Sequence, residues 1–290
     1  MPANVFPSLR LLSETFFLVA GAVFLHGCAS SQATPTAPPK IRKRTSPPLK
    51  TKRASDAIPQ SARGRIVHNI KTKQKVFALT FDDGPQPRYT REVLDILKAN
   101  HIRATFFQIG VKVKEFPKIA RSVSEAGHVL GNHTWSHPSH PKNARAEFEN
   151  TDAILVRVHG KRPDLFRPPY GLVRNGLADV AKAHGDAVIL WNSVGADWSK
   201  KATSGSIASQ ILRLAKPGGI ALLHDGGGIR SATVAALPRI IEVLRQRGYR
   251  FVTIPELLRI GPPDTMSEMQ FWHKNGLKLK NGRVEKARKK

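Results

Sequence analysis

Five short groups of carboxylate, imidazole and guanidinium side chains recur along the middle of this 290-residue chain. They are Asp82-Asp83, His133 with His137, Arg167, Asp197, and His224-Asp225. Carboxylates and imidazoles hold divalent ions in proteins, and they are also the commonest groups for moving protons in catalysis. If the fold brings the five groups together, they could bind a metal ion and act as acid and base beside it.

Each group alone has an ordinary structural explanation. An Asp-Asp-Gly sequence is more often a turn, and a spacing like that of His133 and His137 more often marks two surface histidines than a metal site. A His-Asp pair at a strand end can be a satisfied polar pair. All five groups, however, lie at the ends of segments that we expect to be strands, and turn chemistry is a poor explanation for five such cases.

The segments that must position these groups alternate between two patterns from residue 75 to residue 259. Short apolar, β-prone runs predict strands at 76–81, 104–109, 128–131, 165–167, 187–193, 219–224 and 250–253. Apolar residues at helical spacing predict helices at 89–100, 116–126, 144–159, 175–184, 206–214 and 233–247. This alternation predicts an α/β fold with a largely parallel sheet, and six or seven units suit a small or incomplete barrel.

In a parallel α/β barrel the carboxyl ends of the strands share one face, so the five groups can converge although they lie far apart in sequence. No Gly-x-Gly-x-x-Gly or phosphate loop follows any expected strand, which disfavours a nucleotide-binding sheet. Ser136 and Ser193 raise the possibility of a serine hydrolase, but the sequence has no Gly-x-Ser-x-Gly elbow.

The five groups, with their neighbours, resemble in order the five motifs of the NodB-homology polysaccharide deacetylases, which form carbohydrate esterase family four. The matching stretches are Thr80-Phe81-Asp82-Asp83-Gly84-Pro85, His133-Thr134-Trp135-Ser136-His137, Arg167-Pro168-Pro169-Tyr170, Asp197-Trp198 and Leu223-His224-Asp225. The resemblance covers residues 75–259. It implies a distorted (β/α) barrel with about seven strands, and metal-dependent removal of acetyl groups from chitin, chitooligosaccharides, peptidoglycan or xylan.

The resemblance also implies a role for each residue on the metal side of the site. Asp83, His133 and His137 would hold one divalent ion, for which Zn²⁺ suits the ligand set best and Co²⁺ or another divalent ion is an alternative. Asp82 would be the general base, and Arg167 would pair with its carboxylate and hold it in place. The roles of Asp82 and Asp83 could also be exchanged, because the sequence does not say which carboxylate faces the metal.

On the other side of the site the resemblance makes His224 the general acid, with Asp197 holding its imidazolium. The backbone N–H of Tyr170 would help to stabilise the oxyanion, and Trp198 and Leu222 would line a slot for the acetyl methyl group. The chain departs from the family pattern at Val194, where an acidic residue is usual, and at Ala221, where a large aliphatic residue is usual. We expect these departures to alter substrate fit or rate and to leave the chemistry intact.

Other histidines fit no part of the pattern. We expect His128 to be a strand residue and His140 to lie on a loop surface, while His68, His159 and His184 receive no role.

The segment 1–28 carries the features of an export signal. Arg10 precedes a run of ten apolar or small residues at 16–25, which is too short to span a bilayer but suits a signal peptide. The following Leu25-His26-Gly27-Cys28 resembles a bacterial lipobox, so we expect Cys28, the one cysteine, to be lipidated; ordinary secretion is the alternative. The predicted organisation is a signal at 1–28, a disordered Pro-, Ser- and Lys-rich linker at 29–73, the deacetylase domain at 74–260 and a basic tail at 261–290.

The net charge of +26 is concentrated in the flanks of the chain. The segment 40–53 carries +7 and the segment 274–290 carries +7, so these two short stretches supply 14 of the 26 charges. Such arms are attracted to polyanions, and anionic lipid or an acidic wall polymer would serve. No nucleic-acid motif is present, and an export signal separates the protein from nucleic acid.

We therefore expect an exported, membrane-anchored or secreted monomer that acts on N-acetylglucosamine in a glycan, with peptidoglycan as the leading substrate. Chitooligosaccharide, an exopolysaccharide or xylan is the alternative substrate, and a non-catalytic glycan-binding protein is the alternative function.

Overall fold

The computed structural model describes residues 57–264, 277–280 and 283–286. The strands are β1 (Ile66–Val67), β2 (Asn69–Ile70), β3 (Val76–Gly84), β4 (Thr105–Gln108), β5 (Val129–Asn132), β6 (Leu165–Phe166), β7 (Ala187–Ile189), β8 (Ser193–Val194), β9 (Gly219–His224), β10 (Arg250–Phe251), β11 (Pro263–Asp264), β12 (Leu277–Lys280) and β13 (Arg283–Lys286). The α-helices are α1 (Tyr89–Ala99), α2 (Gly110–Glu115), α3 (Pro117–Glu125), α4 (Ala144–His159), α5 (Leu177–Ala183), α6 (Ser204–Leu214), α7 (Ser231–Gln246) and α8 (Ile254–Ile260). Two 3₁₀ turns, η1 (Gln60–Ala62) and η2 (Pro169–Gly171), complete the set.

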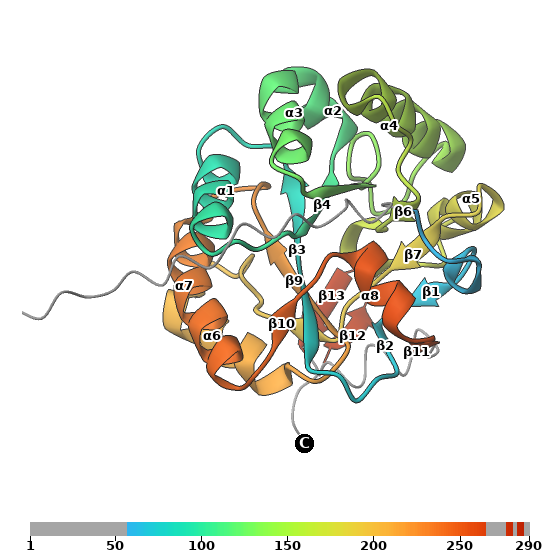
Figure 1. Cartoon of the computed structure of the whole chain (residues 1–290). Helices are drawn as coiled ribbons and strands as arrows, with labels where there is room; N and C mark the ends of the chain where they lie inside the picture. The colour runs from blue at the N-terminus through green and yellow to red at the C-terminus, as the bar shows by residue number, and fades with distance from the viewer. Residues whose placement is uncertain (1–56, 265–276, 281–282, 287–290) are drawn as a thin grey trace, which may run out of the picture. The chain divides into compact units, whose positions relative to one another are not determined.

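The main sheet has nine strands and is parallel throughout. Its order is β1-β7-β6-β5-β4-β3-β9-β8, and β10 also pairs with β3. The strands β7 and β8, on opposite sides of this path, are separated only by the segment 190–192. The sheet therefore curves round on itself into a distorted barrel, with α1, α3, α4, α6 and α7 around its outside and α8 across one end (Figure 1). The predicted α/β barrel is confirmed.

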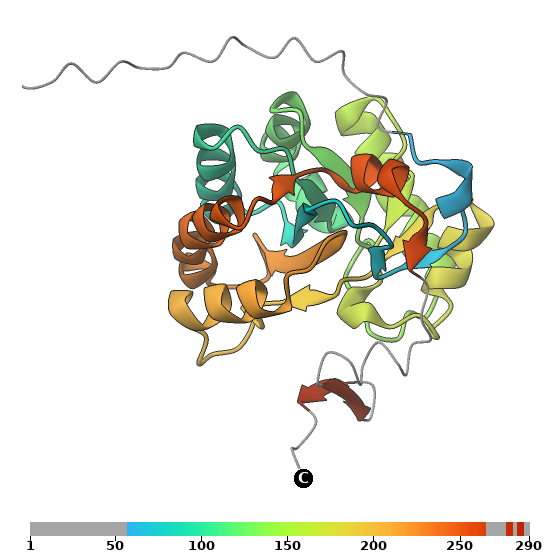
Figure 2. The same cartoon turned by 60° about the horizontal axis from the view of Figure 1, so that its bottom comes forward.

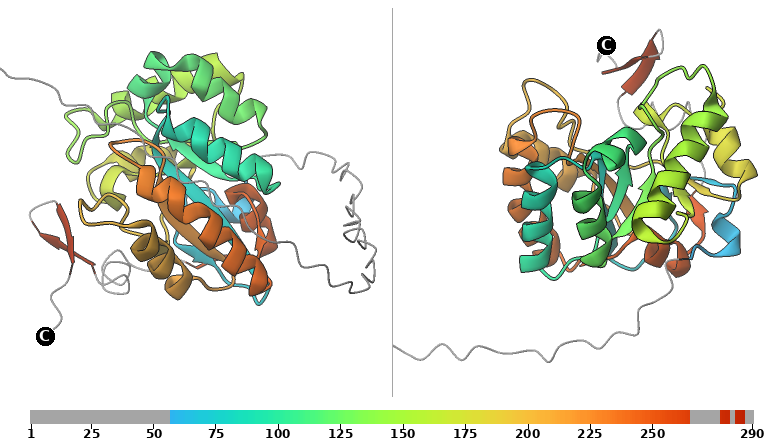
Figure 3. Two further views of the ribbon diagram at one scale, coloured as in Figure 1. Left: turned by 90° about the vertical axis from the view of Figure 1, so that its left-hand side faces the viewer. Right: turned by 90° about the horizontal axis from the view of Figure 1, so that it is seen from above.

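Strand β3 explains how the barrel acquires an inside and an outside. Successive side chains of a strand point to opposite faces. Accordingly Val76 and Ala78 pack in the inner core cluster, whereas Phe77, Leu79 and Phe81 pack against the apolar faces of α1 and α7. Helices α1, α3 and α4 lie side by side along one flank (right panel of Figure 3). All residues of β3 except Asp83 are buried, because the strand has neighbours on both sides.

The expected strands and helices are present, with differences at particular places. The expected strand at 187–193 is broken into β7 and β8. The expected helix at 116–126 begins at Pro117, and a separate short helix, α2, precedes it. Helix α8 was not predicted. It begins with a capping box, in which the side chain of Thr253 accepts a hydrogen bond from the backbone N–H of Glu256 and the side chain of Glu256 accepts one from the backbone N–H of Thr253.

The predicted boundary of the linker at residue 73 is wrong. The structure is folded from residue 57, and Ile58, Ala62, Val67 and Ile70 are buried. Strand β1 pairs in parallel with β7, so the N-terminal segment (blue in Figure 2) lies beside the yellow part of the barrel. The Lys and Arg residues of 63–75 suggested an exposed tether, but they alternate with apolar residues that enter the core.

The predicted end of the domain at residue 260 also moves. Strand β11 pairs antiparallel with β2, so the folded part extends at least to Asp264. Within the predicted basic tail, β12 and β13 form a two-stranded antiparallel hairpin. The predicted export signal, Cys28 and the segment 29–56 of the predicted linker lie outside the described residues. Among the described helices, none combines the length and apolar character that a bilayer crossing requires.

Candidate active site

Asp82 and Asp83 end strand β3, and a bulge decides where their side chains point. Adjacent strand residues normally face opposite sides, but the pairing of β3 with β4 shifts register between Asp82 and Gly84. Asp83 has a positive φ of 72° at this bulge. A bulge re-aims the side chains of its strand. Both carboxylates consequently line one cleft, although a regular strand would have sent Asp83 outward with Phe81.

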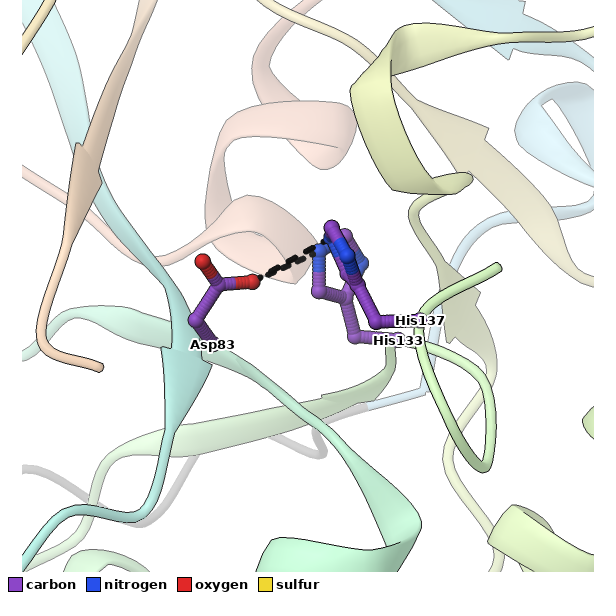
Figure 4. A group of neighbouring side chains, drawn as sticks. All are labelled: Asp83, His133 and His137. Carbon is purple, nitrogen blue, oxygen red and sulfur yellow. Dashed lines mark ion pairs between the residues drawn. The ribbon is translucent and has the colours of Figure 1, made fainter. Parts of the chain in front are cut away.

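The loop after β5 carries His133 and His137 to the same cleft (Figure 4). The Nε2 atoms of His133 and His137 lie 3.5 Å and 3.3 Å from Oδ1 of Asp83. One ligand atom from each residue lies within 4.8 Å of the other two. Burial alone would raise the pKa of Asp83, but the rings of His133, His224 and His137 hold it well below its ordinary value. Burial and the neighbouring His133 lower the pKa of His137 to about 4, so His137 is neutral at pH 7.

A backbone carbonyl on the side away from Asp83 fixes the orientation of the His133 ring. Its Nδ1 lies 2.7 Å from the backbone carbonyl oxygen of Arg167. A carbonyl only accepts, so Nδ1 carries the proton and donates it. The lone pair of Nε2 then faces Asp83. A backbone partner of this kind fixes the tautomer of a metal-ligating histidine.

Arg167, from the end of β6, holds Asp82. Its Nη1 donates to Oδ1 of Asp82 at 2.7 Å and to Oγ1 of Thr80 at 2.7 Å. Its Nε and Nη2 donate to the carbonyls of Ile189 and Leu190. The guanidinium is fully buried and lies 4.2 Å from the centre of the Phe107 ring. The pairing of Arg167 with Asp82 that the resemblance implied is therefore present in the geometry.

His224, at the end of β9, is paired with Asp197 on the far side of the cleft. Its Nδ1 lies 2.7 Å from Oδ1 of Asp197, and its backbone N–H donates to Oδ2 at 2.9 Å. Thr233 donates a third hydrogen bond to the same carboxylate at 2.8 Å. Burial alone would lower the pKa of His224, but the charge and hydrogen bond of Asp197 raise it to about 9. Burial likewise opposes the charge of Asp197, yet His224 holds the pKa of Asp197 below its ordinary value.

The groups described above surround one cleft of about 660 Å³. Tyr170 and Trp198 stand at its rim and are 48 % and 42 % exposed. The Tyr170 ring meets His137 edge-on at 4.7 Å, and the Trp198 ring meets His224 edge-on at 5.6 Å. Leu222 also lines the cleft. Tyr170 and Trp198 thus each contact an imidazole of the site, and Leu222 is a buried part of the lining.

The backbone is unusual where the site is built. Among the described residues other than glycine, six have positive φ. Four of these belong to the loops of the site, and a fifth, Asp83, lies at the bulge of β3; the four are Thr134, His137, Tyr170 and Ala196. Such conformations cost free energy and persist only where the surrounding structure enforces them. The concentration of strained backbone in these loops marks them as a functional region.

The remaining candidate residues lie away from the cleft lining. His128 is buried, and its Nδ1 accepts from the backbone of Ala104, whereas His140 is exposed. The lining does not include His68, His159 or His184, nor Ser136 or Ser193. Of the two departures from the family pattern, Ala221 faces the helices and Val194 is buried in the inner core cluster, so neither lines the cleft.

Sequence reasoning missed two residues that support this site. Arg230 lines the cleft, and Thr233 bonds Asp197. Thr233 is the first residue of the helix expected after His224 and Arg230 lies three residues before it, where polar residues are common on protein surfaces. Their proximity to the last motif, and to the three glycines that precede them, was the only available signal.

Comparison with known proteins supports the resemblance. The sequence profile of the polysaccharide deacetylase family matches residues 69–189. A peptidoglycan-N-acetylglucosamine deacetylase of Bacillus cereus is 40% identical over 202 residues, which cover 68% of this chain and 94% of that protein. A chitooligosaccharide deacetylase of Sinorhizobium fredii is 34% identical over 193 residues, covering 61% of this chain and 89% of that protein.

The fold agrees with these sequence relatives. The crystal structure of the Bc1960 peptidoglycan N-acetylglucosamine deacetylase superposes with a TM-score of 0.65 at 33% identity. The superposition covers 69% of this chain and 95% of that structure. The chain therefore belongs to the polysaccharide deacetylase family, whose active members are hydrolases that remove acetyl groups from polysaccharides.

Proposed function

We propose that this protein removes acetyl groups from N-acetylglucosamine residues of peptidoglycan, with a divalent ion held by Asp83, His133 and His137. The observation that carries this proposal is the arrangement of one cleft, in which Asp82 and His224 lie beside the same carboxylate–imidazole trio. The substrate follows from similarity, because the Bacillus cereus relative that matches over nearly its whole length is a peptidoglycan-N-acetylglucosamine deacetylase.

The residues present fit a metal ion. Oδ1 of Asp83 is buried without a hydrogen-bond partner among the described residues, and two imidazole nitrogens face it at 3.3 Å and 3.5 Å. Ligand atoms that lie about 2.0–2.2 Å from a tetrahedral ion are roughly 3.3–3.6 Å apart. Two nitrogens and one oxygen favour Zn²⁺, and Co²⁺ is a second candidate. A divalent ion at this place would polarise the acetamide carbonyl and activate water.

Asp82 is the proposed general base. Its Oδ1 is bound by Arg167, and its Oδ2 lies 3.7 Å from Nε2 of His133. Arg167 cannot turn away, because its other nitrogens are bonded to the carbonyls of Ile189 and Leu190. One oxygen of Asp82 is thus held while the other faces the metal side of the cleft, where it can accept the proton of an attacking water.

His224 is the proposed general acid. An amine leaves an amide only when its nitrogen is protonated, and a group with a pKa of about 9 carries that proton at neutral pH. Because Nδ1 is bound to Asp197, the proton available to the substrate is on Nε2. The backbone N–H of Tyr170 is proposed to stabilise the oxyanion, while Leu222 and Trp198 supply an apolar wall for the acetyl methyl group.

Acetate release from purified peptidoglycan tests the proposal. We expect release in the presence of Zn²⁺ or Co²⁺, loss of activity with a chelator, and recovery on adding the metal back. Chitooligosaccharide, an N-acetylated exopolysaccharide and acetylated xylan, assayed in parallel, identify the preferred glycan. A protein that binds these glycans but releases no acetate from any of them with added metal would be a glycan-binding protein and would contradict the proposed activity.

We also propose that the protein acts outside the cytoplasm and is anchored through Cys28. The support is the apolar run at 16–25 followed by the lipobox-like Leu25–Cys28. Metabolic labelling with a radioactive fatty acid should mark the wild-type protein and leave Cys28→Ser unlabelled. Secretion of the wild-type protein without label would indicate an ordinary signal peptide.

A further inference from the structure

The loop between β9 and α7 packs directly against the proposed metal ligand Asp83. It contains three consecutive glycines, Gly226, Gly227 and Gly228. A Cβ on Gly226 would lie 2.1 Å from the backbone oxygen of Asp83, and one on Gly227 would lie 2.3 Å from its Oδ2. Only glycine therefore allows this approach. We call residues 226–228 the glycine loop.

Such a loop cannot hold itself in place. Glycines carry no side chain to pack, and they lose more backbone freedom on folding than other residues do. The residue that follows them, Ile229, is 80 % exposed and contributes no core packing. A fixed position for the glycine loop therefore requires an anchor other than the glycines themselves.

Arg230 supplies that anchor. Its Nε donates to the carbonyl of Gly226 at 2.6 Å, and its Nη2 donates to the carbonyl of Gly227 at 3.0 Å. Its Nη1 donates to the carbonyl of Asp197 at 3.1 Å. Arg230 is only 6 % exposed, although it lines the cleft. One planar guanidinium thus joins the glycine loop beside Asp83 to the residue that orients His224.

The three partners are neutral carbonyl oxygens, which suit a fork of N–H donors. A lysine ammonium is a compact charge and does not reproduce the fixed geometry of a guanidinium. The cation also lies close enough to Asp197 to be one of the influences that hold the pKa of that carboxyl low. The three hydrogen bonds depend on the shape of the Arg230 guanidinium, and the effect on Asp197 depends on its charge, so the site uses both.

We propose that Arg230 is a positioning residue that sets the distance between the metal-binding carboxylate of Asp83 and the proton donor His224. This inference rests on the proposed function for its kinetic consequence. Hydrolysis needs the ion and the acid on opposite sides of one acetamide, and misplacing reacting groups by about 1 Å can cost roughly 100-fold in rate. Loss of Arg230 should therefore impair the chemical step more than substrate binding.

The test compares Arg230→Met and Arg230→Lys with Arg239→Met, a control on the same helix. Arg239 is exposed and forms its ion pair with the exposed Glu242. At saturating Zn²⁺ we expect kcat of Arg230→Met on peptidoglycan fragments to fall about 10- to 100-fold, with KM changed by less than about threefold. Arg230→Lys should remain well below wild type, and the control should match wild type.

A second measurement does not depend on activity. We expect Arg230→Met to bind Zn²⁺ about tenfold more weakly than the control in a competition with a chromophoric chelator. Without Arg230 the glycine loop is no longer held against Asp83, and that carboxylate is less well positioned. If Arg230→Met lowers the melting temperature but leaves kcat and Zn²⁺ affinity within about twofold of the control, the residue is merely structural and the inference is wrong. If wild type releases no acetate while Zn²⁺ affinity still falls in Arg230→Met, the proposed function fails and the positioning role stands.

Discussion

Asp82 and Asp83 are chemically identical neighbours, and the structure gives them different surroundings. Oδ1 of Asp82 receives the guanidinium of Arg167, whereas Oδ1 of Asp83 faces the imidazoles of His133 and His137. The bulge at Asp83 makes this division possible, because it turns both side chains toward the cleft. The geometry thus favours Asp83 as the metal ligand and Asp82 as the base, over the exchange of these two roles that the sequence left open.

This division of roles predicts that substitutions at Asp82 and Asp83 affect kcat and Zn²⁺ affinity differently. Asp82→Asn should lower kcat by about 10²- to 10⁴-fold, because an amide cannot accept the proton of water, while Zn²⁺ affinity stays near that of wild type. Asp83→Asn should lose Zn²⁺ affinity as well. Acetate release and Zn²⁺ titration measure the two effects, and Asp95→Asn on the exposed side of α1 is the control. Retention of activity in Asp82→Asn within about tenfold of wild type would assign the base elsewhere.

The His224–Asp197 pair predicts an alkaline limit to activity. His224 donates its proton, so activity should fall as the pH rises through about 9, the pKa to which Asp197 raises it. In Asp197→Asn the supporting charge is lost, the pKa of His224 drops, and the alkaline limb should move to lower pH. A pH profile of kcat for both proteins measures the shift. An unchanged alkaline limb in Asp197→Asn would mean that another group titrates there.

The same pair has a consequence for stability with the same sign. A histidine whose pKa is raised by folding stabilises the folded state fully below its unfolded pKa of roughly 6.5, and that contribution is lost as pH rises through about 9. Because their opposite charges and hydrogen bond raise the pKa of His224 to about 9 and hold that of Asp197 below its ordinary value, the pair remains ionised across the neutral range.

The positions of the site residues were predictable from sequence to different degrees. The residue pattern and the family resemblance together placed ten residues in one proposed site, and all ten line or adjoin one cleft. The resemblance assigned the metal to Asp83 and the base to Asp82, but the residue pattern alone could not divide these roles, because the division depends on a one-residue register shift. Arg230 was missed because its partners are backbone carbonyls, which leave no pattern of residue types.

At the scale of elements, the long periodic segments were predictable, whereas the two-residue strands β1 and β2 were not. Helices α4 and α7 and strand β9 match their expected ranges closely, since each buries a regular apolar pattern. Strands β1 and β2 have two residues each, and their sequence, Ile66–Ile70 with neighbouring cations, carries no period that could be detected. What stabilises them is the edge of β7 and the pairing with β11, both distant in sequence.

The buried side chains of residues 57–73 predict that this segment is needed for a stable fold. A chain that starts at residue 74 lacks the buried side chains of Ile58, Val67 and Ile70. Each buried aliphatic side chain stabilises by about 1.5–3 kcal/mol, against a total of roughly 5–15 kcal/mol for a domain. We expect this chain to unfold at a much lower temperature than a chain that starts at residue 55, as measured by circular dichroism. Equal melting temperatures would show that residues 57–73 are dispensable.

At the scale of the whole molecule, charge is the dominant feature. The segment 57–264 has 31 Lys and Arg against 17 Asp and Glu, or +14, and the two flanks 1–56 and 265–290 together add +12. A cationic protein approaches an anionic polymer faster than a neutral one, and the effect is screened by salt. The net charge thus acts on encounter with a surface.

This charge predicts a salt dependence that differs between substrates. Acetate release from intact peptidoglycan should fall steeply between roughly 0.05 and 0.5 M NaCl, because the Debye length shrinks to a few ångströms. Release from a neutral chitooligosaccharide should change little over the same range. A chain limited to residues 55–264 should show a weaker salt dependence on peptidoglycan than the full chain. Equal salt dependence on the two substrates would exclude charge-assisted encounter.

The break between β7 and β8 has a consequence for how this barrel could evolve or be redesigned. The carbonyls of Ile189 and Leu190, at and just after the end of β7, accept hydrogen bonds from Arg167. In a continuous strand across 187–194 those oxygens would accept hydrogen bonds from a neighbouring strand, and the Arg167 guanidinium would lose two of its acceptors. The break between β7 and β8 therefore helps to hold Arg167, and through it the proposed base Asp82. Sequence changes that make 187–194 one continuous strand should raise the stability of the protein and lower its kcat.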